Sequence, residues 1–300
     1  MYEEYAEHRE NHIEIPSIQW FPGHMAKTRR MITDSLKLVD LVLEIADARI
    51  PRSSRNPELD QWVSGKPRIL MLNKSDNADP ELTRRWLEYY RAEGLPAFAC
   101  DCKTGTGVNQ FAPLVKRTLA ELLARREEKG MAGRMIRVMV VGVPNVGKSS
   151  FINRMAGSRR AKAEDRPGVT RNKQWVSLDK DMELLDMPGV LWPKFDDPLV
   201  GEKLAFTGAV KDDVIDIELL AARLLANLAK EYPKRLEERY KLSDFGELDG
   251  WALLEQVGRK RGMLISGGEV NTERAAITVV DEYRSGKLGR ITFEAPGESA

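Results

Sequence analysis

The chain has 300 residues, of which 42% are hydrophobic and 31% are charged, and its formal net charge is +1. This length suits one large domain or two smaller ones, and the composition excludes disordered and fibrous proteins. No apolar run approaches the roughly 18 residues that cross a bilayer, and the polar, acidic first residues differ from a secretory signal, so we expect a cytoplasmic protein without a membrane partner.

The first 200 residues alternate between two kinds of hydrophobic pattern. After a flexible polar tail over residues 1–15, the patterns predict helix 25–40, strand 41–46, helix 56–63, strand 68–72, helix 79–93, strand 97–100 and helix 108–128. A Gly-containing breaker at 129–133 leads to strand 136–141, helix 149–156 and strands 174–178 and 182–185. Continuous apolar strands between helices predict a mostly parallel sheet covered by helices on both faces.

After about residue 210 the strand pattern disappears. Helices are predicted at 217–232, 233–240, 250–261 and 272–285, with an ordinary core stripe of leucines on the first of them. We therefore expect an α/β domain over residues 16–205 and an all-α domain over residues 206–300.

The two cysteines, Cys100 and Cys102, lie at the end of a predicted strand, and we expect their side chains to point opposite ways. With only three histidines scattered elsewhere, the sequence favours reduced structural thiols over a Cys/His metal site.

The strongest motif begins where strand 136–141 ends. Gly142, four further residues and then Gly147-Lys148-Ser149 form the phosphate-binding pattern G-x-x-x-x-G-K-S, between a strand and a helix as this motif requires. Backbone N–H groups of such a loop cradle phosphate oxygens at a helix N-terminus. Lys148 would reach the β- and γ-phosphates, and the Ser149 hydroxyl would coordinate Mg²⁺.

A second motif names the base. Asn73-Lys74-Ser75-Asp76 matches N-K-x-D at the end of a strand. The Asp76 carboxylate can accept from both N1–H and the 2-amine of guanine, whereas adenine offers neither donor and would leave the carboxylate unpaired at a cost of about 1–3 kcal/mol. Asn73 would bond around the base and the phosphate loop, and the Lys74 stem would lie along the base. The nucleotide is therefore GTP or GDP.

Three weaker patterns complete the set by their order. Asp101-Cys102-Lys103 stands where an S-A-K element backs guanine, with a simple strand-to-loop turn as the equal alternative. Thr170 is the candidate switch residue for Mg²⁺ and the γ-phosphate. Asp186-x-x-Gly189 fits an aspartate that binds Mg²⁺ through water and a glycine whose N–H contacts the γ-phosphate.

Together these motifs define one set of predicted nucleotide-binding residues. Nucleotide binding is assigned to Asn73, Lys74, Ser75, Asp76, Cys102, Lys103, Asn145, Val146, Gly147, Lys148, Ser149, Ser150, Thr170 and Gly189. In ordinary GTPases the phosphate loop precedes the base motif, and here it follows. One copy of each motif means one site, so the fold is a circularly permuted P-loop GTPase, a rearrangement that neighbouring surface termini tolerate.

The permuted order, together with the segments IQWFPGHMAKTRR, DARIP, NKSD, GVPNVGKSS, RPGVTR and LDMPGV, resembles the RbgA/YlqF family of bacterial ribosome-assembly GTPases over about residues 17–200. The resemblance implies an RNA-binding C-terminal domain and a role in late maturation of the large ribosomal subunit. It also implies that the ribosomal particle, with its rRNA and proteins, stimulates GTP hydrolysis, which is coupled to release.

The chemistry lacks one usual residue. GTPases often place a water-orienting glutamine directly after D-x-x-G, and here the position is Val190. We expect slow intrinsic hydrolysis, with Lys148 and His24 as the catalytic candidates. A neutral imidazole can orient water, and the resemblance implicates this histidine, although a structural role beside the following helix is the alternative. Asn145 in similar loops helps to hold K⁺, or it simply stabilises the turn.

Partner contacts are less specific. The segment 154–173 carries seven basic and two acidic residues (Arg154, Arg159, Arg160, Lys162, Glu164, Asp165, Arg166, Arg171 and Lys173), which fits either a solvated face or RNA contact. Trp20, Phe21 and residues 259–261 are further candidates. We expect a monomer, and the alternatives to a ribosome-assembly GTPase are a nucleotide-dependent RNA-binding scaffold and a GTPase that acts on another RNA partner.

Overall fold

The computed structural model describes residues 22–131, 133–157, 174–179, 181–192, 195, 197–242 and 248–297. These residues form two compact units. One unit contains the described residues up to 192 together with 292–297, and the other contains those from 195 to 291. None of the described helices is both long and apolar enough to span a membrane.

The first unit is built on a six-stranded sheet with the order β3-β2-β1-β4-β6-β5. Its strands are β1 Leu41–Asp47, β2 Arg68–Asn73, β3 Ala97–Ala99, β4 Ile136–Val141, β5 Gln174–Asp179 and β6 Met182–Asp186. Five strands run parallel and β5 pairs antiparallel with β6. The carboxyl ends of the five parallel strands therefore meet at one edge, where ligands bind in open α/β sheets.

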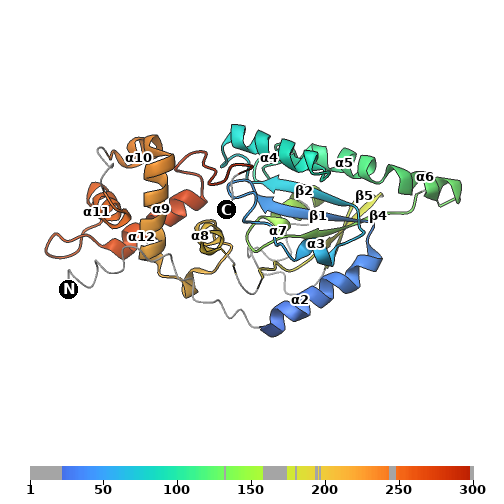
Figure 1. Cartoon of the computed structure of the whole chain (residues 1–300), viewed down its shortest axis with the longest axis horizontal. Coiled ribbons are helices and arrows are strands. Elements are labelled where there is room, and N and C mark those ends of the chain that lie inside the picture. The colour runs from blue at the N-terminus through green and yellow to red at the C-terminus, as the bar shows by residue number, and fades with distance from the viewer. Residues whose placement is uncertain are drawn as a thin grey trace. The chain divides into compact units, whose positions relative to one another are not determined.

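Helices cover both faces of this sheet (Figure 1). Their bounds are α2 Pro22–Ser35, α3 Leu59–Trp62, α4 Pro80–Ala92, α5 Phe111–Thr118, α6 Ala120–Glu128 and α7 Lys148–Ala156. On one face Ile32 and Trp62 pack against Val42, while Trp86 packs against Ala46 of the same strand. On the other face the ring of Phe111 lies between those of Phe98 and Phe151, tilted relative to Phe98 and edge-to-face with Phe151. The predicted mostly parallel, two-sided α/β architecture is confirmed.

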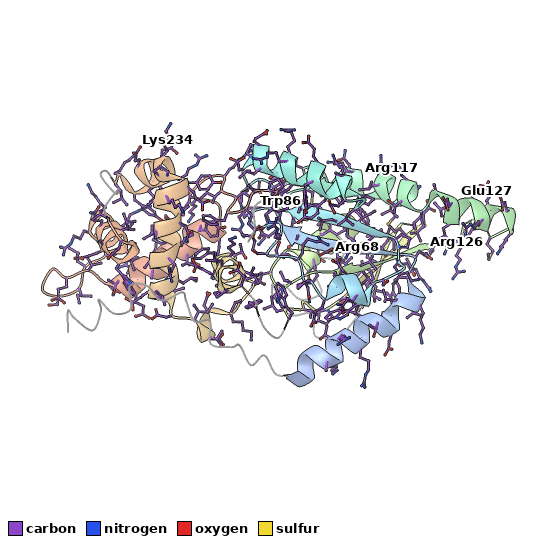
Figure 2. The ribbon with its side chains drawn as sticks, viewed as in Figure 1. Arg68, Trp86, Arg117, Arg126, Glu127 and Lys234 are labelled. Atoms are coloured by element: carbon purple, nitrogen blue, oxygen red, sulfur yellow. The ribbon has the colours of Figure 1, made fainter. Side chains whose placement is uncertain are left out.

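Several predicted boundaries differ from the structure. The single helix predicted over 108–128 is wrong: a 3-10 turn, Val108–Gln110, is followed by α5 and α6, which are separated at Leu119. Leu119 has φ −101° and ψ 14°, outside the helical region, while its side chain is buried. Beyond it Arg126 anchors α6 by an ion pair with Asp40 (Figure 2). The helix predicted over 56–63 is shorter, because the chain makes turns until residue 58.

The described residues of the second unit are mainly helical, with one isolated antiparallel bridge between Leu264 and Val270. Its helices are α8 Pro198–Phe206, α9 Ile217–Glu231, α10 Pro233–Tyr240, α11 Gly250–Lys260 and α12 Thr272–Arg284, with a 3-10 turn at Asp212–Val214. The leucine stripe of α9 is buried at Leu220, Leu224, Leu225 and Leu228, whereas Leu219 is only partly buried.

Helix α8 was missed by the pattern analysis although its start carries a signal. The Asp197 carboxylate caps it by accepting from the Leu199 N–H at 2.8 Å, and Pro198 occupies the first helical position. The same Asp-Pro pair correctly marked the start of α4, where Asp79 caps Glu81 and Leu82.

Candidate nucleotide-binding site

The G-x-x-x-x-G-K-S segment forms a turn directly after β4 and leads into α7 at Lys148. Its two glycines have no room for side chains. A Cβ on Gly142 would lie 2.4 Å from the Ile45 carbonyl oxygen, and one on Gly147 would lie 2.2 Å from Asn73 Nδ2. Gly142, Asn145 and Gly147 have φ of +153°, +60° and +98°, so the loop needs positive φ at three positions. The close approach of β1 and β2 thus fixes the shape of the loop.

Lys148 folds back over its own loop. Its Nζ donates to the carbonyl oxygens of Gly142 at 3.1 Å and Val143 at 2.9 Å, and the side chain is buried. Burial lowers the pKa of Lys148 to about 8, although the nearby Asp186 carboxylate opposes this shift. The ammonium is therefore held at the loop with few charged partners, which favours capture of phosphate oxygens.

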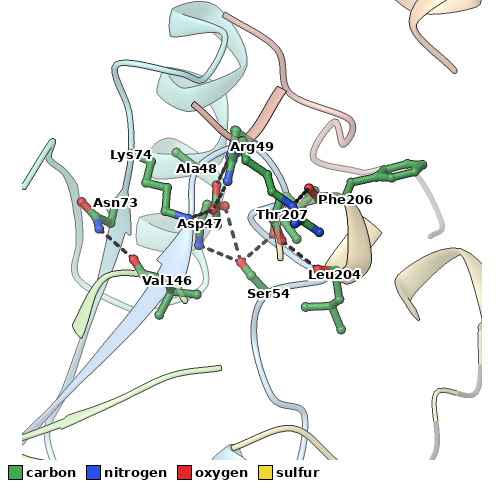
Figure 3. Close-up of polar contacts among 12 residues, drawn as sticks. Asp47, Ala48, Arg49, Ser54, Asn73, Lys74, Val146, Leu204, Phe206 and Thr207 are labelled. Atoms are coloured by element: carbon green, nitrogen blue, oxygen red, sulfur yellow. Dashed lines mark hydrogen bonds and ion pairs between the residues drawn. The ribbon is translucent and has the colours of Figure 1, made fainter. Parts of the chain in front are cut away.

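Asn73 connects the base motif to the phosphate loop. Its Nδ2 donates to the Val146 carbonyl oxygen at 2.7 Å, and its Oδ1 accepts from the Cys102 N–H at 3.2 Å (Figure 3). One carboxamide thus joins three segments that follow β2, β3 and β4. The contact of Asn73 with the base stays a prediction.

The segment after β3 is organised by Asp101. Its carboxylate accepts from the backbone N–H groups of Lys103 at 2.7 Å and Thr104 at 2.9 Å. Burial alone would raise the pKa of Asp101, but hydrogen bonds from Thr104 and Lys103 hold it below its ordinary value. The structure therefore places the S-A-K-like residues in a braced loop beside Asn73.

Two details of this loop correct the sequence interpretation. The side chains of Cys100 and Cys102 do not point opposite ways, because their Sγ atoms lie 3.7 Å apart and both thiols are buried. Residues two apart share a face wherever the chain stays extended. Arg154, counted among candidate RNA contacts, donates from Nε to the Cys102 carbonyl at 3.0 Å and also bonds the Lys103 carbonyl. It braces the loop from α7.

Asp76 also lies at this edge of the sheet, and its carboxylate is partly buried. Burial raises its pKa, and the neighbouring charge of Asp101 raises it further. Two N–H donors from a guanine edge would relieve both effects, since donors to a carboxylate stabilise its charged form. The electrostatics of this position suit the base contact that the motif predicts.

The D-x-x-G segment contacts the phosphate loop from β6. Ser149 Oγ lies 3.4 Å from Asp186 Oδ2, within hydrogen-bond distance. A Cβ on Gly189 would lie 2.9 Å from the backbone of Pro144 and 3.0 Å from Lys148 Nζ. Lys148, Ser149, Asp186 and Gly189 are therefore together at one edge of the sheet.

Val190, where a water-orienting glutamine is often found, belongs to the core. Its side chain is 6% exposed and packs in the apolar cluster that contains Ile32, Trp62 and Met187, while its N–H donates to the Gly142 carbonyl at 3.3 Å. The backbone of Val190 therefore bonds to the phosphate loop, while its side chain packs in the apolar core.

Other predicted residues have simpler surroundings or lie outside the description. The Ser75 N–H donates to the Cys100 carbonyl at 3.2 Å, and Ser150 is exposed on α7. Thr170 and most of the basic segment lie outside the described residues, as does the side chain of His24. Trp20 and Phe21 are also outside them.

Sequence reasoning missed Asp47 and Arg49 as parts of this edge. Lys74, with φ +59°, pairs through Nζ with Asp47 Oδ2 at 2.9 Å, and Arg49 binds the same carboxylate (Figure 3). Their position in the sequence could have indicated this role, because Asp47 and Arg49 follow the mostly apolar run 41–46 just as the base motif follows the apolar run 69–72.

Comparisons with a family model and with individual proteins both match this chain to ribosome-related GTPases. A family model described as 50S ribosome-binding GTPase matches residues 137–243. Ribosome biogenesis GTPase A of Priestia megaterium is 48% identical over 284 residues, which cover 94% of this chain and 98% of that protein. The protein of the same name from Thermotoga maritima is 32% identical over 279 residues, or 93% of this chain and 95% of the relative.

Two solved structures are similar over most of the chain. The GDP-bound structure of TM YlqF has a TM-score of 0.67 and 29% identity and covers 90% of this chain and all of that one (100%). The GNP-bound YlqF from T. maritima has a TM-score of 0.62 and 29% identity and covers 91% of this chain and 100% of its own.

Proposed function

This chain belongs to the ribosome biogenesis GTPase A family and is a GTP hydrolase, and from that premise we propose that it binds a precursor of the large ribosomal subunit and promotes its late maturation. In this proposal the bound particle stimulates GTP hydrolysis, and hydrolysis is coupled to release. The observation that carries it is the burial of Val190 beside the phosphate loop, to which Asn73 of the base motif is bonded. A site that binds GTP but has a buried valine where a water-orienting glutamine is often found suits external activation.

In the proposed mechanism each motif has one task. Asp76 accepts from the guanine edge, and Asn73 holds the base segment against the phosphate loop. Lys148 exchanges its bonds to the Gly142 and Val143 carbonyls for phosphate oxygens and balances charge there.

Mg²⁺ fits the residues present. A serine hydroxyl and a carboxylate oxygen 3.4 Å apart are hard oxygen donors of the kind that Mg²⁺ prefers together with phosphates. Ser149 would coordinate the ion directly and Asp186 through water, with Thr170 as a further predicted ligand. When bound, Mg²⁺ neutralises charge on the β- and γ-phosphate oxygens.

K⁺ is a second proposed ion, near Asn145. The left-handed backbone of Asn145, with φ +60°, places an amide-bearing residue at the tip of the phosphate loop. Equal GTP turnover in K⁺ and Na⁺ buffers would count against this ion.

His24 is the proposed catalytic histidine. It belongs to the first turn of α2, and a neutral imidazole can orient the attacking water near pH 7. A His24→Ala protein should bind GTP normally and lose particle-stimulated turnover. Unchanged stimulated turnover would remove His24 from the mechanism.

Hydrolysis is proposed to act on the helical unit through the D-x-x-G segment. In the permuted chain, Asp186–Gly189 is followed within about ten residues by α8, which begins at Pro198. Loss of γ-phosphate contacts would change the mobility of that unit. Identical hydrogen exchange of residues 197–291 in the GDP and non-hydrolysable GTP states would contradict this coupling.

The helical unit is proposed to contact rRNA. Arg259 pairs with Glu255, and Arg261 contacts Glu282 and the Tyr240 ring, so part of their charge serves the fold. Lys260 between them is exposed. The protein is further proposed to be a cytoplasmic monomer of 33.9 kDa, which light scattering can measure.

Measurement of GTP turnover with and without purified large subunits tests the whole proposal. Strong stimulation by large subunits, and none by small subunits, is expected. Binding without stimulation would instead favour a nucleotide-dependent RNA-binding scaffold, and stimulation by another RNA would favour a different partner.

A further inference from the structure

A buried carboxylate lies behind the lysine of the base motif. Asp47, the last residue of β1, is 1% exposed. Its Oδ1 accepts from Arg49 Nε at 2.9 Å, its Oδ2 accepts from Arg49 Nη2 at 2.8 Å, and Lys74 Nζ lies 2.9 Å from the same Oδ2. Figure 3 shows both cations converging on this carboxylate.

These contacts hold the carboxylate of Asp47 in one position. Burial would raise the pKa of Asp47, but the charges of Arg49 and Lys74 hold it well below its ordinary value. A bidentate guanidinium–carboxylate pair restricts rotation of both groups, and a buried one requires its partners to stay in place. Lys74 therefore has a defined amine position.

That position matters because of where Lys74 stands. It follows Asn73, which bonds the phosphate loop, and precedes Asp76 by two residues. The ion pair with Asp47 restricts the conformation of the aliphatic part of the Lys74 side chain. Such an aliphatic chain can cover the face of a ring while its charged end pairs with another group.

The turn that carries Asp47 and Arg49 is itself held by residues from the far end of the chain. The Phe293 N–H donates to the Arg49 carbonyl at 2.9 Å. Thr292 Oγ1 donates to the Ala48 carbonyl at 3.3 Å and accepts from the Asp79 N–H at 3.0 Å. Residue 292 thus links the segment that follows Asp47 at the end of β1 to the segment that follows β2, which contains Lys74.

Glu294 adds a charged anchor to the same turn. It is 8% exposed, and its carboxylate accepts from the Arg52 N–H at 2.7 Å and bonds both the N–H and the hydroxyl of Ser53. Its carbonyl accepts from Nε1 of the buried Trp86, which is labelled in Figure 2, at 2.8 Å.

We propose that Asp47 is a positioning residue for guanine recognition, acting through Lys74, and that the segment 292–294 holds the turn that carries it. The inference rests on the proposed base-binding role of residues 73–76. It makes the C-terminal end of the chain a structural part of the nucleotide site.

The test compares nucleotide affinities of full-length variants. Asp47→Asn keeps the shape of the side chain and removes the charge that holds Lys74. Glu44→Gln is the matched control, because Glu44 is a 1% exposed carboxylate on the same strand, paired with Arg55 at 2.9 Å and away from Lys74. Dissociation constants for GTP and GDP are measured for both proteins well below their melting temperatures.

Asp47→Asn should weaken GTP and GDP by the same factor of about ten, equivalent to about 1.4 kcal/mol, while Glu44→Gln stays within twofold. The effect should be non-additive with Lys74→Met, since both changes remove one interaction. Additive losses, or an affinity loss no greater than that of Glu44→Gln, would overturn the proposal.

Glu294→Gln provides a second variant that leaves Asp47 in place and serves if Asp47→Asn does not fold. It should weaken both nucleotides by about threefold in the wild-type background, and by much less in the Lys74→Met background. No change in the wild-type background would refute the role of segment 292–294. If Lys74→Met binds GTP normally while Asp76→Asn still weakens it, the role of Asp47 fails and the proposed base site stands. If Asp76→Asn also binds GTP normally, the proposed base site itself fails.

Discussion

The carboxamide of Asn73 donates a 2.7 Å hydrogen bond to the carbonyl oxygen of Val146, and so joins the end of β2 to the phosphate loop. The two residues are 73 positions apart in the chain. Because β1 lies between β2 and β4, the bond crosses a strand, and it is possible only where Gly147 leaves space. The segments predicted to bind the base and the phosphates are therefore joined directly.

This contact makes Gly147 a sensitive position. In a Gly147→Ala protein the new Cβ would meet Asn73 Nδ2 at 2.2 Å, in addition to the cost of φ +98°. We expect a loss of more than about 2 kcal/mol of stability and at least tenfold weaker GTP binding, measured by chemical denaturation and nucleotide titration. Gly94→Ala is the control, with φ +78° and open space around it, and should cost only about 1 kcal/mol. Equal effects of the two changes would contradict the role of the Asn73 contact.

Much of the site could be predicted from sequence because each motif directly follows a strand. Parallel strands bring their carboxyl ends to one edge, so Asn73, Ser149 and Asp186 had to converge once the strands were recognised. The spacing within each motif then assigned the chemistry without knowledge of the packing.

The contacts that brace the motifs could not be predicted in this way. Arg154 and Asp47 act through partners 52 and 27 positions away in the chain, and a charge count treats such residues as surface. Likewise, the break at Leu119 depends on burial of that side chain, which periodicity does not encode.

Asp76→Asn should change which base is bound. An amide offers one acceptor and one donor where the carboxylate offered only acceptors, which mismatches the two N–H donors of guanine and matches the N–H and carbonyl of xanthine. We expect GTP affinity to fall by roughly 10–150-fold, from the loss of about 1.5–3 kcal/mol in bonds to a charged group. Competition between GTP and xanthosine triphosphate measures this, and a retained preference for GTP would show that other residues read the base.

Lys148 should take up a proton when GTP binds in mildly alkaline solution. With a pKa of about 8 it is partly neutral there, and phosphate charges would restore the proton. We expect more proton uptake per GTP at pH 8.5 than at pH 7, from calorimetry in buffers of different ionisation enthalpy. A binding enthalpy independent of buffer at pH 8.5 would contradict this.

The same lysine also affects the stability of the nucleotide-free protein. Its pKa is lowered from 10.5 in the ordinary side chain to about 8 in the fold, so between these values the unfolded chain binds more protons. The contribution of Lys148 to the free energy of unfolding should therefore rise with pH across this window. Urea denaturation at pH 8 and pH 10, compared with a Lys148→Met protein, isolates this contribution.

Restoring a glutamine at position 190 should not restore intrinsic hydrolysis. Because Val190 is 6% exposed among apolar side chains, Val190→Gln would bury an amide without a partner there. We expect a loss of about 1–3 kcal/mol of stability and no faster GTP turnover in the absence of the ribosomal particle. Val190→Ile, which keeps the side chain apolar, should leave turnover unchanged at a smaller stability cost. Faster intrinsic turnover in the glutamine protein would mean that this side chain reaches the γ-phosphate, and would remove the reason for assigning activation to the particle.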